Sequence, residues 1–204
     1  MYPDVFGDTG PGIFVLDPSI FVDTFKQESF DPRWLFSGVF ESPPNDRHSS
    51  WLYVSSGLSN PWEDDAPDPT GVSGLGCELV LESVARGEWA IRRVQHLVAF
   101  QTLLACGRYP GRGLLDVHDR IPLRAPITTE PSELTWLFVA EPEGYPASAQ
   151  LPSGRVDFLH VVGITEAEAG LARERGGAEL VELLRRAGAL PVTDPARACT
   201  VARR

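Results

Sequence analysis

The sequence predicts a single α+β domain, in which a mixed and largely antiparallel sheet packs against a few helices. Strand-like segments dominate residues 1–82, whereas helical periodicity marks the middle and the end of the chain. Strands and helices that are grouped in blocks, without strict alternation, are typical of this class. The chain has 204 residues, 43% of them apolar, and a chain of that size can bury a core without disulfides or metals. We therefore expect residues 1–204 to form one domain.

Short apolar runs predict the first strands. Residues 13–16 and 34–40 are two such runs, and a proline-containing turn follows each of them. Residues 50–55, rich in aromatic and β-branched side chains, predict a third strand. A turn-rich stretch over 57–76 separates it from residues 77–82, where apolar and mainly acidic residues alternate. That alternation predicts a strand with one largely polar face.

A long helix and two further strands are predicted in the middle of the chain. Apolar residues recur at helical spacing over 88–105, and Gly107 is a natural stop. Residues 134–140 are almost continuously apolar and predict a buried central strand. A Pro-Ser-Gly turn at 152–154 leads into a strand over 155–162. We expect these two strands to be antiparallel neighbours.

Two helices are predicted at the end of the chain. Thr165 and Glu168 have the spacing of a capping box, in which hydroxyl and carboxylate each satisfy a free backbone N–H. The glycine pair at 176–177 interrupts this helix, because two glycines cost about 2 kcal/mol relative to alanine. A second helix follows over 178–187, and Gly188 caps it.

The net charge of −10 is unevenly distributed. Residues 1–82 hold 14 acidic and three basic side chains, whereas residues 83–204 hold 14 acidic and 15 basic ones. The first part therefore carries −11 and the rest +1. An acidic surface repels phosphate backbones and favours basic partners, so we expect no nucleic-acid binding. Such a surface also keeps a protein in solution, and the sequence leaves that simpler interpretation open.

The sequence contains no targeting or membrane signal. No apolar run approaches the ~18 residues of a membrane span. The N-terminus lacks the basic and then apolar stretches of a secretory signal. We expect a cytoplasmic protein that does not bind membranes.

No catalytic group of residues can be assembled from the sequence. The serines of residues 55–59 flank a glycine but do not form the G-x-S-x-G elbow of a hydrolase. Asp157 and His160 are three positions apart on a predicted strand, so they point to opposite faces. We interpret His160 as a core or edge histidine and predict no catalytic residues.

No metal or cofactor is predicted either. The acidic residues of 63–68 lack the glycine and glutamate that a calcium loop requires. The glycines of 107–113 follow a helix and lack the Lys-Ser/Thr of a phosphate loop. The three cysteines are expected to be buried small apolar residues. Two interpretations stay open for a set of arginines, an anion-binding patch and ion pairs with the acidic part of the chain: Arg108, Arg112, Arg120 and Arg124.

Three segments together resemble the suppressor of fused domain family. Residues 53–63 are a strand running into a Gly-Leu-Ser turn, and residues 73–81 are a strand entered through paired glycines. Residues 151–168 combine a turn, a strand and the start of a helix. The likeness covers residues 50–195, while residues 1–45 form a divergent N-terminal part. Nine residues carry the resemblance: Gly57, Ser59, Gly74, Gly76, Glu78, Gly154, Phe158, Gly163 and Thr165.

We interpret these nine residues as determinants of the fold. The four glycines other than Gly163 suit turns in which a Cβ would clash. Glu78 is expected to hydrogen-bond the backbone of a neighbouring loop.

The resemblance implies a protein-binding role without catalysis. Eukaryotic members restrain a transcription factor by holding a short segment of it, partly by strand addition. They carry a further C-terminal domain, and this chain is too short to be expected to have one. Bacterial single-domain members of the family are often proposed to be immunity proteins that neutralise toxin domains, and basic toxin domains would suit the acidic surface. A peptide-binding scaffold and a small hydrolase or transferase are the alternatives.

One loop is the predicted contact with a partner. It follows a strand, is rich in acid and proline, and contains an aromatic side chain of the kind that interfaces favour. The alternative is that its tryptophan packs inward and holds the loop in place. The predicted contacts are Trp62, Glu63, Asp64, Asp65 and Asp68.

Overall fold

The computed structural model describes residues 1–10, 12–61 and 68–201. Eight strands form one sheet in the order β1-β2-β3-β4-β8-β6-β5, with β7 also paired to β8. The single α+β fold with a mixed, mostly antiparallel sheet is confirmed. The strands are β1 (Ile13–Val15), β2 (Gly38–Ser42), β3 (Trp51–Ser56), β4 (Val72–Ser83), β5 (Arg120–Pro122), β6 (Leu134–Ala140), β7 (Ser148–Leu151) and β8 (Gly154–Thr165).

The two longest strands, β4 and β8, are parallel neighbours at the centre of the sheet. Each of the other strand pairs in the described residues is antiparallel, including β6 with β8, as predicted. Residues 134–140 form the buried interior strand that was predicted, since β6 pairs with β8 on one side and with the short edge strand β5 on the other. β6 is apolar on both faces because helices cover both.

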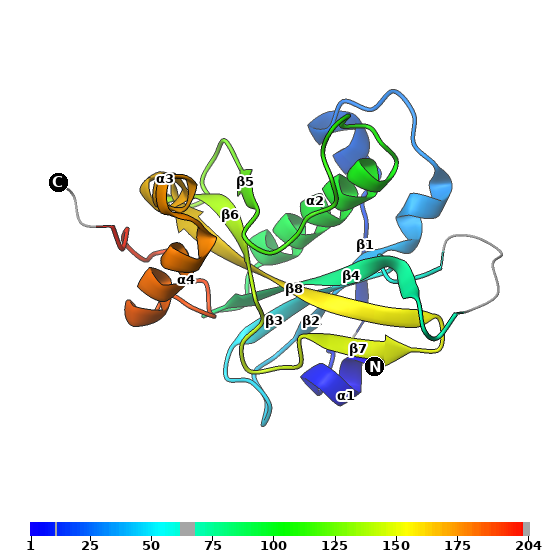
Figure 1. Cartoon of the computed structure of the whole chain (residues 1–204), viewed down its shortest axis with the longest axis horizontal. Helices are drawn as coiled ribbons and strands as arrows, with labels where there is room; N and C mark the ends of the chain where they lie inside the picture. Colours follow the sequence, from blue (N-terminus) through cyan, green and yellow to red (C-terminus); the bar gives the residue numbers. More distant parts are fainter. Residues whose placement is uncertain (11, 62–67, 202–204) are drawn as a thin grey trace.

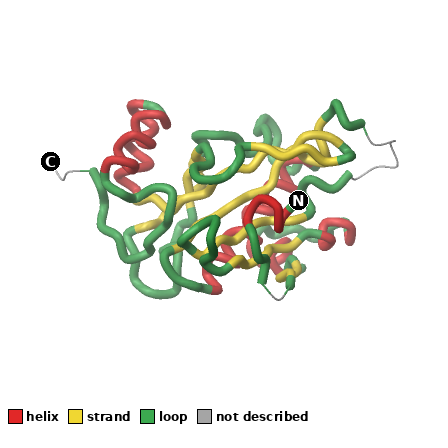
Figure 2. Tube along the Cα trace, turned by 90° about the horizontal axis from the view of Figure 1, so that it is seen from below, coloured by secondary structure: helices red, strands yellow, loops and turns green. Residues whose placement is uncertain are grey.

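Helices pack on both faces of the sheet (Figure 1). The long helix α2 (Glu88–Ala105) covers one face, in a core that includes Leu79, Leu159 and Val161. On the other face, α3 (Glu166–Arg175) and α4 (Gly177–Arg186) pack against β6 and β8. The short helix α1 (Tyr2–Phe6) packs on that second face too, and Figure 2 shows it beside the N-terminus, in front of the strands.

The predicted helices are present with small shifts at their ends. α2 has the predicted bounds, and α3 begins with the predicted capping box of Thr165 and Glu168. Gly176 separates α3 from α4, which starts one residue earlier than predicted.

Two predicted features of the first half are wrong. Residues 34–40 are not one strand, since a 3₁₀ turn η2 (Pro32–Phe36) precedes β2 and buries Trp34. β4 has no exposed polar face, because Glu78, Val80 and Glu82 are all buried. Phe6 of α1 packs on Val80, and this helix was not predicted.

Candidate functional site

Glu78 joins β4 to the loop that follows β3. Its carboxylate is fully buried and accepts hydrogen bonds from the backbone N–H groups of Gly57 (3.0 Å) and Ser59 (2.9 Å). The Ser59 hydroxyl donates at 2.7 Å, and the Ser55 hydroxyl donates as well. The expected hydrogen bonds between Glu78 and a neighbouring loop are therefore present. Burial raises the pKa of Glu78, although the four donors oppose that shift.

Two glycines allow three loops to approach one another beside Glu78. Gly74 has a φ of +57°, and a Cβ there would lie 2.4 Å from the Asn60 carbonyl oxygen. Gly154 has a φ of +129°, and its Cβ would lie 2.8 Å from the Gly71 carbonyl oxygen. A larger residue at either position would push the backbones apart. We call residues 57–60, 71–76 and 152–154, together with Glu78, the glycine junction.

Serine side chains complete the glycine junction. The Ser73 hydroxyl lies 2.6 Å from the Ser59 carbonyl oxygen and 2.6 Å from the Ser153 hydroxyl. Ser73 is fully buried. One hydroxyl therefore connects the three loops, although Ser73 and Ser153 are 80 positions apart in the sequence. Gly76 lies in the same junction, with a φ of +76°.

The other family-like residues lie further along β8, where Phe158 is paired in register with Glu78. Phe158 packs against Phe6 with ring centroids 5.2 Å apart. The Gly163 N–H donates to the Thr193 hydroxyl at 3.1 Å, and Thr165 caps α3. The structure therefore places six of the nine predicted residues in the glycine junction, Phe158 beside Glu78 in the sheet, and Gly163 and Thr165 at the far end of β8.

The predicted partner-binding loop emerges from the glycine junction. Only its last predicted contact, Asp68, lies within the described residues. Asp68 is exposed and accepts hydrogen bonds from the Thr70 N–H (2.8 Å) and the Thr70 hydroxyl (2.7 Å), which lower its pKa. Four predicted contacts lie outside the described residues: Trp62, Glu63, Asp64 and Asp65.

One buried polar cluster has the residue types of a catalytic group. His160 lies 2.6 Å from the Tyr145 hydroxyl through Nδ1 and donates from Nε2 to the Pro191 carbonyl at 2.8 Å. Its Nδ1 is 4.0 Å from the Glu82 carboxylate, which accepts from the Ser50 hydroxyl. Burial lowers the pKa of His160, although the nearby Glu82 carboxylate opposes that shift. His160, Glu82 and Ser50 are each at most 5% exposed, and this cluster joins core elements.

A second buried cluster was not predicted. Arg197 forms two hydrogen bonds of 2.7 Å with the fully buried Glu168 carboxylate and donates to the Gly163 carbonyl at 2.9 Å. The Thr200 N–H and hydroxyl also donate to Glu168, each at 2.8 Å. These bonds attach the irregular segment 189–201 to the start of α3. Arg197 lies in a segment without periodicity, so no local pattern identified it.

The fold that contains the glycine junction matches a known protein family. A family model described as "Suppressor of fused protein (SUFU)" matches residues 34–198, which include the glycine junction and the Glu168–Arg197 pair. The chain belongs to the suppressor of fused family. The resemblance stated for the sequence is thereby confirmed. No curated protein matches this chain.

Solved structures of the suppressor of fused family share the fold. A chain of the Sufu–Fu complex crystal structure is 21% identical, with a TM-score of 0.61 and 89% of each chain covered. A suppressor of fused homologue from Neisseria gonorrhoeae is 20% identical, with a TM-score of 0.62 and 91% and 95% covered. Drosophila Suppressor of Fused is 24% identical, with a TM-score of 0.55, and the alignment spans 80% of this chain but 42% of that one.

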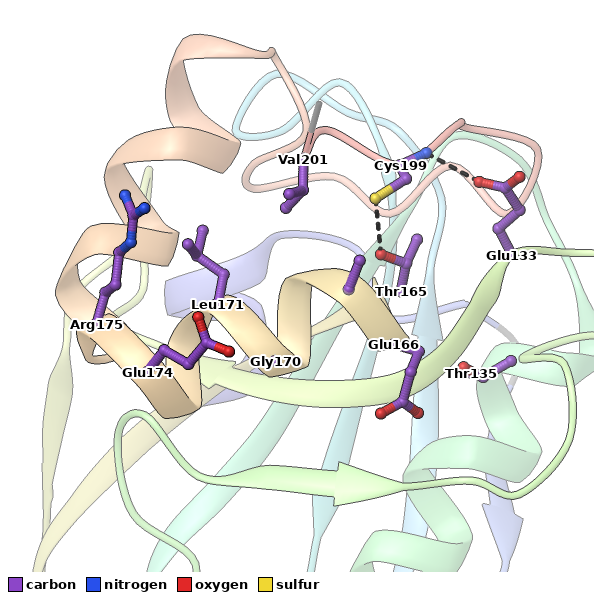
Figure 3. Close-up of a pocket in the computed structure, with 11 residues that line it drawn as sticks. Glu133, Thr135, Thr165, Glu166, Gly170, Leu171, Glu174, Arg175, Cys199 and Val201 are labelled. Atoms are coloured by element: carbon purple, nitrogen blue, oxygen red, sulfur yellow. Dashed lines mark hydrogen bonds between the residues drawn. The ribbon is translucent and has the colours of Figure 1, made fainter. Parts of the chain in front are cut away.

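An open groove of about 830 Å³ lies between α3 and segment 189–201 of this suppressor of fused chain (Figure 3). Leu171 and Val201 supply apolar surface, while Glu133, Glu166 and Glu174 make its lining acidic. The Thr165 hydroxyl lies 3.1 Å from the Cys199 sulfur, and Glu133 accepts from the Cys199 N–H. No described pair in this lining joins a nucleophile to a histidine base.

The four arginines of the predicted anion patch are exposed. Among the described ion pairs, none joins them to the acidic N-terminal part. Arg112 and Arg120 line a groove of about 310 Å³ whose lining also includes Asp116 and Asp119. These carboxylates reduce the positive potential that an anion would need.

The cysteines differ in exposure. Cys77 is buried, and burial raises its pKa to about 12. Cys106 is exposed, so the expectation that all three are buried is wrong. Within residues 1–10, 12–61 and 68–201, no three His, Cys, Asp or Glu side chains are grouped to hold a metal ion. Across the same residues, no helix is long and apolar enough to cross a membrane.

Proposed function

We propose that this chain is a non-catalytic protein-binding module whose partner is a protein or peptide of basic character. Its family includes a chain of the Sufu–Fu complex, with which it shares the fold over 89% of both chains. The observation that carries the proposal is that the titratable groups in the core are buried and hydrogen-bonded to neighbouring groups, out of reach of a substrate. Glu78, His160 and Glu168 are each fully buried, and each is bonded to other core groups.

Buried and mutually bonded groups suit a rigid support, whereas catalysis needs a reactive group that substrate can reach. The nine family-like residues therefore act, in this proposal, as determinants of the fold. The acidic loop that leaves the glycine junction acts as the contact, with Asp68 and the four predicted residues before it.

We further propose that the partner is a toxin domain and that binding neutralises it in the cytoplasm. Residues 1–82 carry −11, and opposite charge on the partner would speed association and favour specificity. Co-expression of this chain with its toxin partner should relieve the growth arrest that the toxin causes, and a toxin-coding neighbour gene would supply the candidate. Unrelieved arrest, with no complex formed, would leave a regulatory peptide-binding scaffold as the function.

The direct test is a pull-down from the source organism with the tagged full chain. We expect one protein to co-purify in fixed ratio and to co-elute with the chain in size-exclusion chromatography. Recovery of no protein, together with stabilisation of the chain by a small metabolite, would favour an enzyme instead.

The loop is tested with a charge-matched pair of variants. Amide substitution of the loop acids should weaken the complex: Glu63→Gln, Asp64→Asn, Asp65→Asn and Asp68→Asn. The control carries the same change in net charge at exposed acids elsewhere: Glu28→Gln, Asp46→Asn, Glu130→Gln and Glu141→Gln. Equal loss of affinity in both variants would show that net charge acts, not the loop.

A further inference from the structure

The first strand of the sheet leaves an apolar edge exposed. Within the described residues, β1 pairs with β2 on one side and has no strand on the other. Val15 is 66% exposed and Ile13 42% exposed. Phe36, which precedes β2, is 78% exposed, and the next residue pairs with Leu16. Exposed apolar side chains on an unpaired strand are uncommon, because such edges invite pairing.

The backbone of β1 is oriented to accept another strand. The Leu16 N–H donates to the Ser37 carbonyl at 3.0 Å and so points toward β2. Residues of an antiparallel ladder alternate in direction, so Ile13 and Val15 turn their N–H and C=O groups outward. Gln95 of α2 donates to the Val15 carbonyl at 2.7 Å, which holds the strand against the helix. The Ile13 groups and the Val15 N–H face away from the sheet.

A groove of about 640 Å³ runs between β1 and α2. Phe14, Leu16 and Ile91 supply apolar lining, and the charged residues in the lining are Asp17, Glu88 and Arg92. Arg92 lies 3.8 Å from Glu88, so these two charges offset each other. Asp17 is exposed and belongs to none of the described ion pairs. It therefore leaves one end of the groove negative.

We propose that the β1 edge and this groove dock an extended segment of a partner protein, with alternating apolar side chains and a lysine or arginine opposite Asp17. The inference rests on the proposed protein-binding function and assigns it a surface. Residues 13–18 precede residue 34, where the family match begins, so the β1 side of the site belongs to the divergent N-terminal part, whereas the α2 side lies within the matched region. A second copy of the chain is a poorer occupant, because two surfaces that each carry −11 over residues 1–82 repel each other.

The test uses a random peptide library displayed on phage and selected against the full chain. We expect enriched peptides to alternate apolar residues with lysine or arginine. Val15→Lys should lower the affinity of the chain for the synthetic peptides at least about tenfold, since residues at the centre of an interface contribute most of the affinity. Val84→Lys is the matched control, because Val84 is also apolar and 56% exposed, and it should leave affinity unchanged. Bound peptide should slow hydrogen exchange at the Val15 amide.

Val15→Pro provides a second arm. It removes the outward N–H but leaves the bonds of Phe14 and Leu16 to β2, and edge strands tolerate proline. Val15→Pro should also lower the affinity for the peptides, while the circular dichroism spectrum of the variant stays that of the wild type.

Two outcomes overturn the site but leave the proposed function standing. In one, the selected peptides bind wild type and both Val15 variants equally and protect other amides. In the other, sedimentation shows a wild-type dimer that Val15→Lys dissociates, so the occupant is a second copy. If the library yields no enriched peptide, the inference and the peptide-binding part of the proposed function both fail.

Discussion

Two buried carboxylates in this protein have opposite pKa shifts because their partners differ. Glu78 accepts only from neutral donors, so burial raises its pKa above the ordinary 4.5. Burial acts the same way on Glu168, but the hydrogen bonds and charge of Arg197 outweigh it and lower the pKa. A raised pKa means that the folded state holds the proton more tightly than the unfolded state, and a lowered pKa means the reverse.

The two shifts predict opposite pH dependences of stability. The contribution of Glu78 is largest at low pH and declines as pH rises from 4.5 through its folded pKa. That of Glu168 is complete above 4.5 and is lost as pH falls through its folded pKa. Urea denaturation across pH should therefore show that wild type loses its advantage over Glu78→Gln at higher pH, and over Glu168→Gln at lower pH. Slopes of the same sign would contradict this.

Substitution of Arg197 should lower the stability of the protein more than substitution of any other arginine. Arg197→Met leaves the buried Glu168 without a counter-ion and should lower the free energy of unfolding by about 3–5 kcal/mol. Arg197→Lys should lower the free energy of unfolding by less, because lysine keeps the charge but not the paired hydrogen bonds. Arg186→Met is the control, since that side chain is 77% exposed and lies 3.9 Å from Glu182. It should cost about 0–1 kcal/mol, and a similar loss in both methionine variants would refute the assignment.

At the scale of elements, the glycine junction combines loops that no local pattern connects. Tight glycine turns were predicted at 57, 74, 76 and 154, but the sequence did not reveal that these turns meet. These turns meet because β4 pairs in parallel with β8, and the two strands are far apart in the sequence. Burial of Ser73 and Glu78 follows from that pairing.

Gly74 offers a test of the junction. Gly74→Ala should destabilise the protein by about 3 kcal/mol, because an alanine Cβ meets a carbonyl oxygen in addition to the cost of positive φ. Gly107→Ala is the matched control, with a similar φ of +68° and no atom within 4 Å of the added Cβ. It should cost about 1 kcal/mol. Equal losses in urea denaturation would mean that backbone strain alone, and not close approach, requires glycine at 74.

The elements that the sequence predicted well have local causes. α2 and α4 follow helical periodicity, and the Thr165–Glu168 capping box marks the start of α3. η2 was missed although Asp31-Pro32 is a helix-start signal, with the Asp31 side chain accepting from the Arg33 N–H. The contacts of segment 189–201 could not be predicted, because they join an irregular stretch to β8 and α3.

At the scale of the whole molecule, the uneven charge should govern how fast a partner binds. Raising ionic strength from about 0.01 M to about 0.15 M shortens the Debye length from about 30 Å to about 8 Å. The association rate with a basic partner should then fall at least about tenfold, with a much smaller change in the dissociation rate. Stopped-flow measurements on the purified complex would check this. A rate that does not depend on salt would mean that the acidic part of the chain does not steer binding.

The central position of β8 also affects synthesis of the protein. Among the described strands β8 is the last in sequence, yet it lies between β4 and β6. While the ribosome is still making residues 154–165, the nascent chain exposes β4 and β6 without their shared neighbour, and such unpaired strands tend to aggregate. A nascent chain stalled before β8 is made should bind chaperones and remain unfolded. A chain whose segment 189–201 has left the ribosome should fold without them.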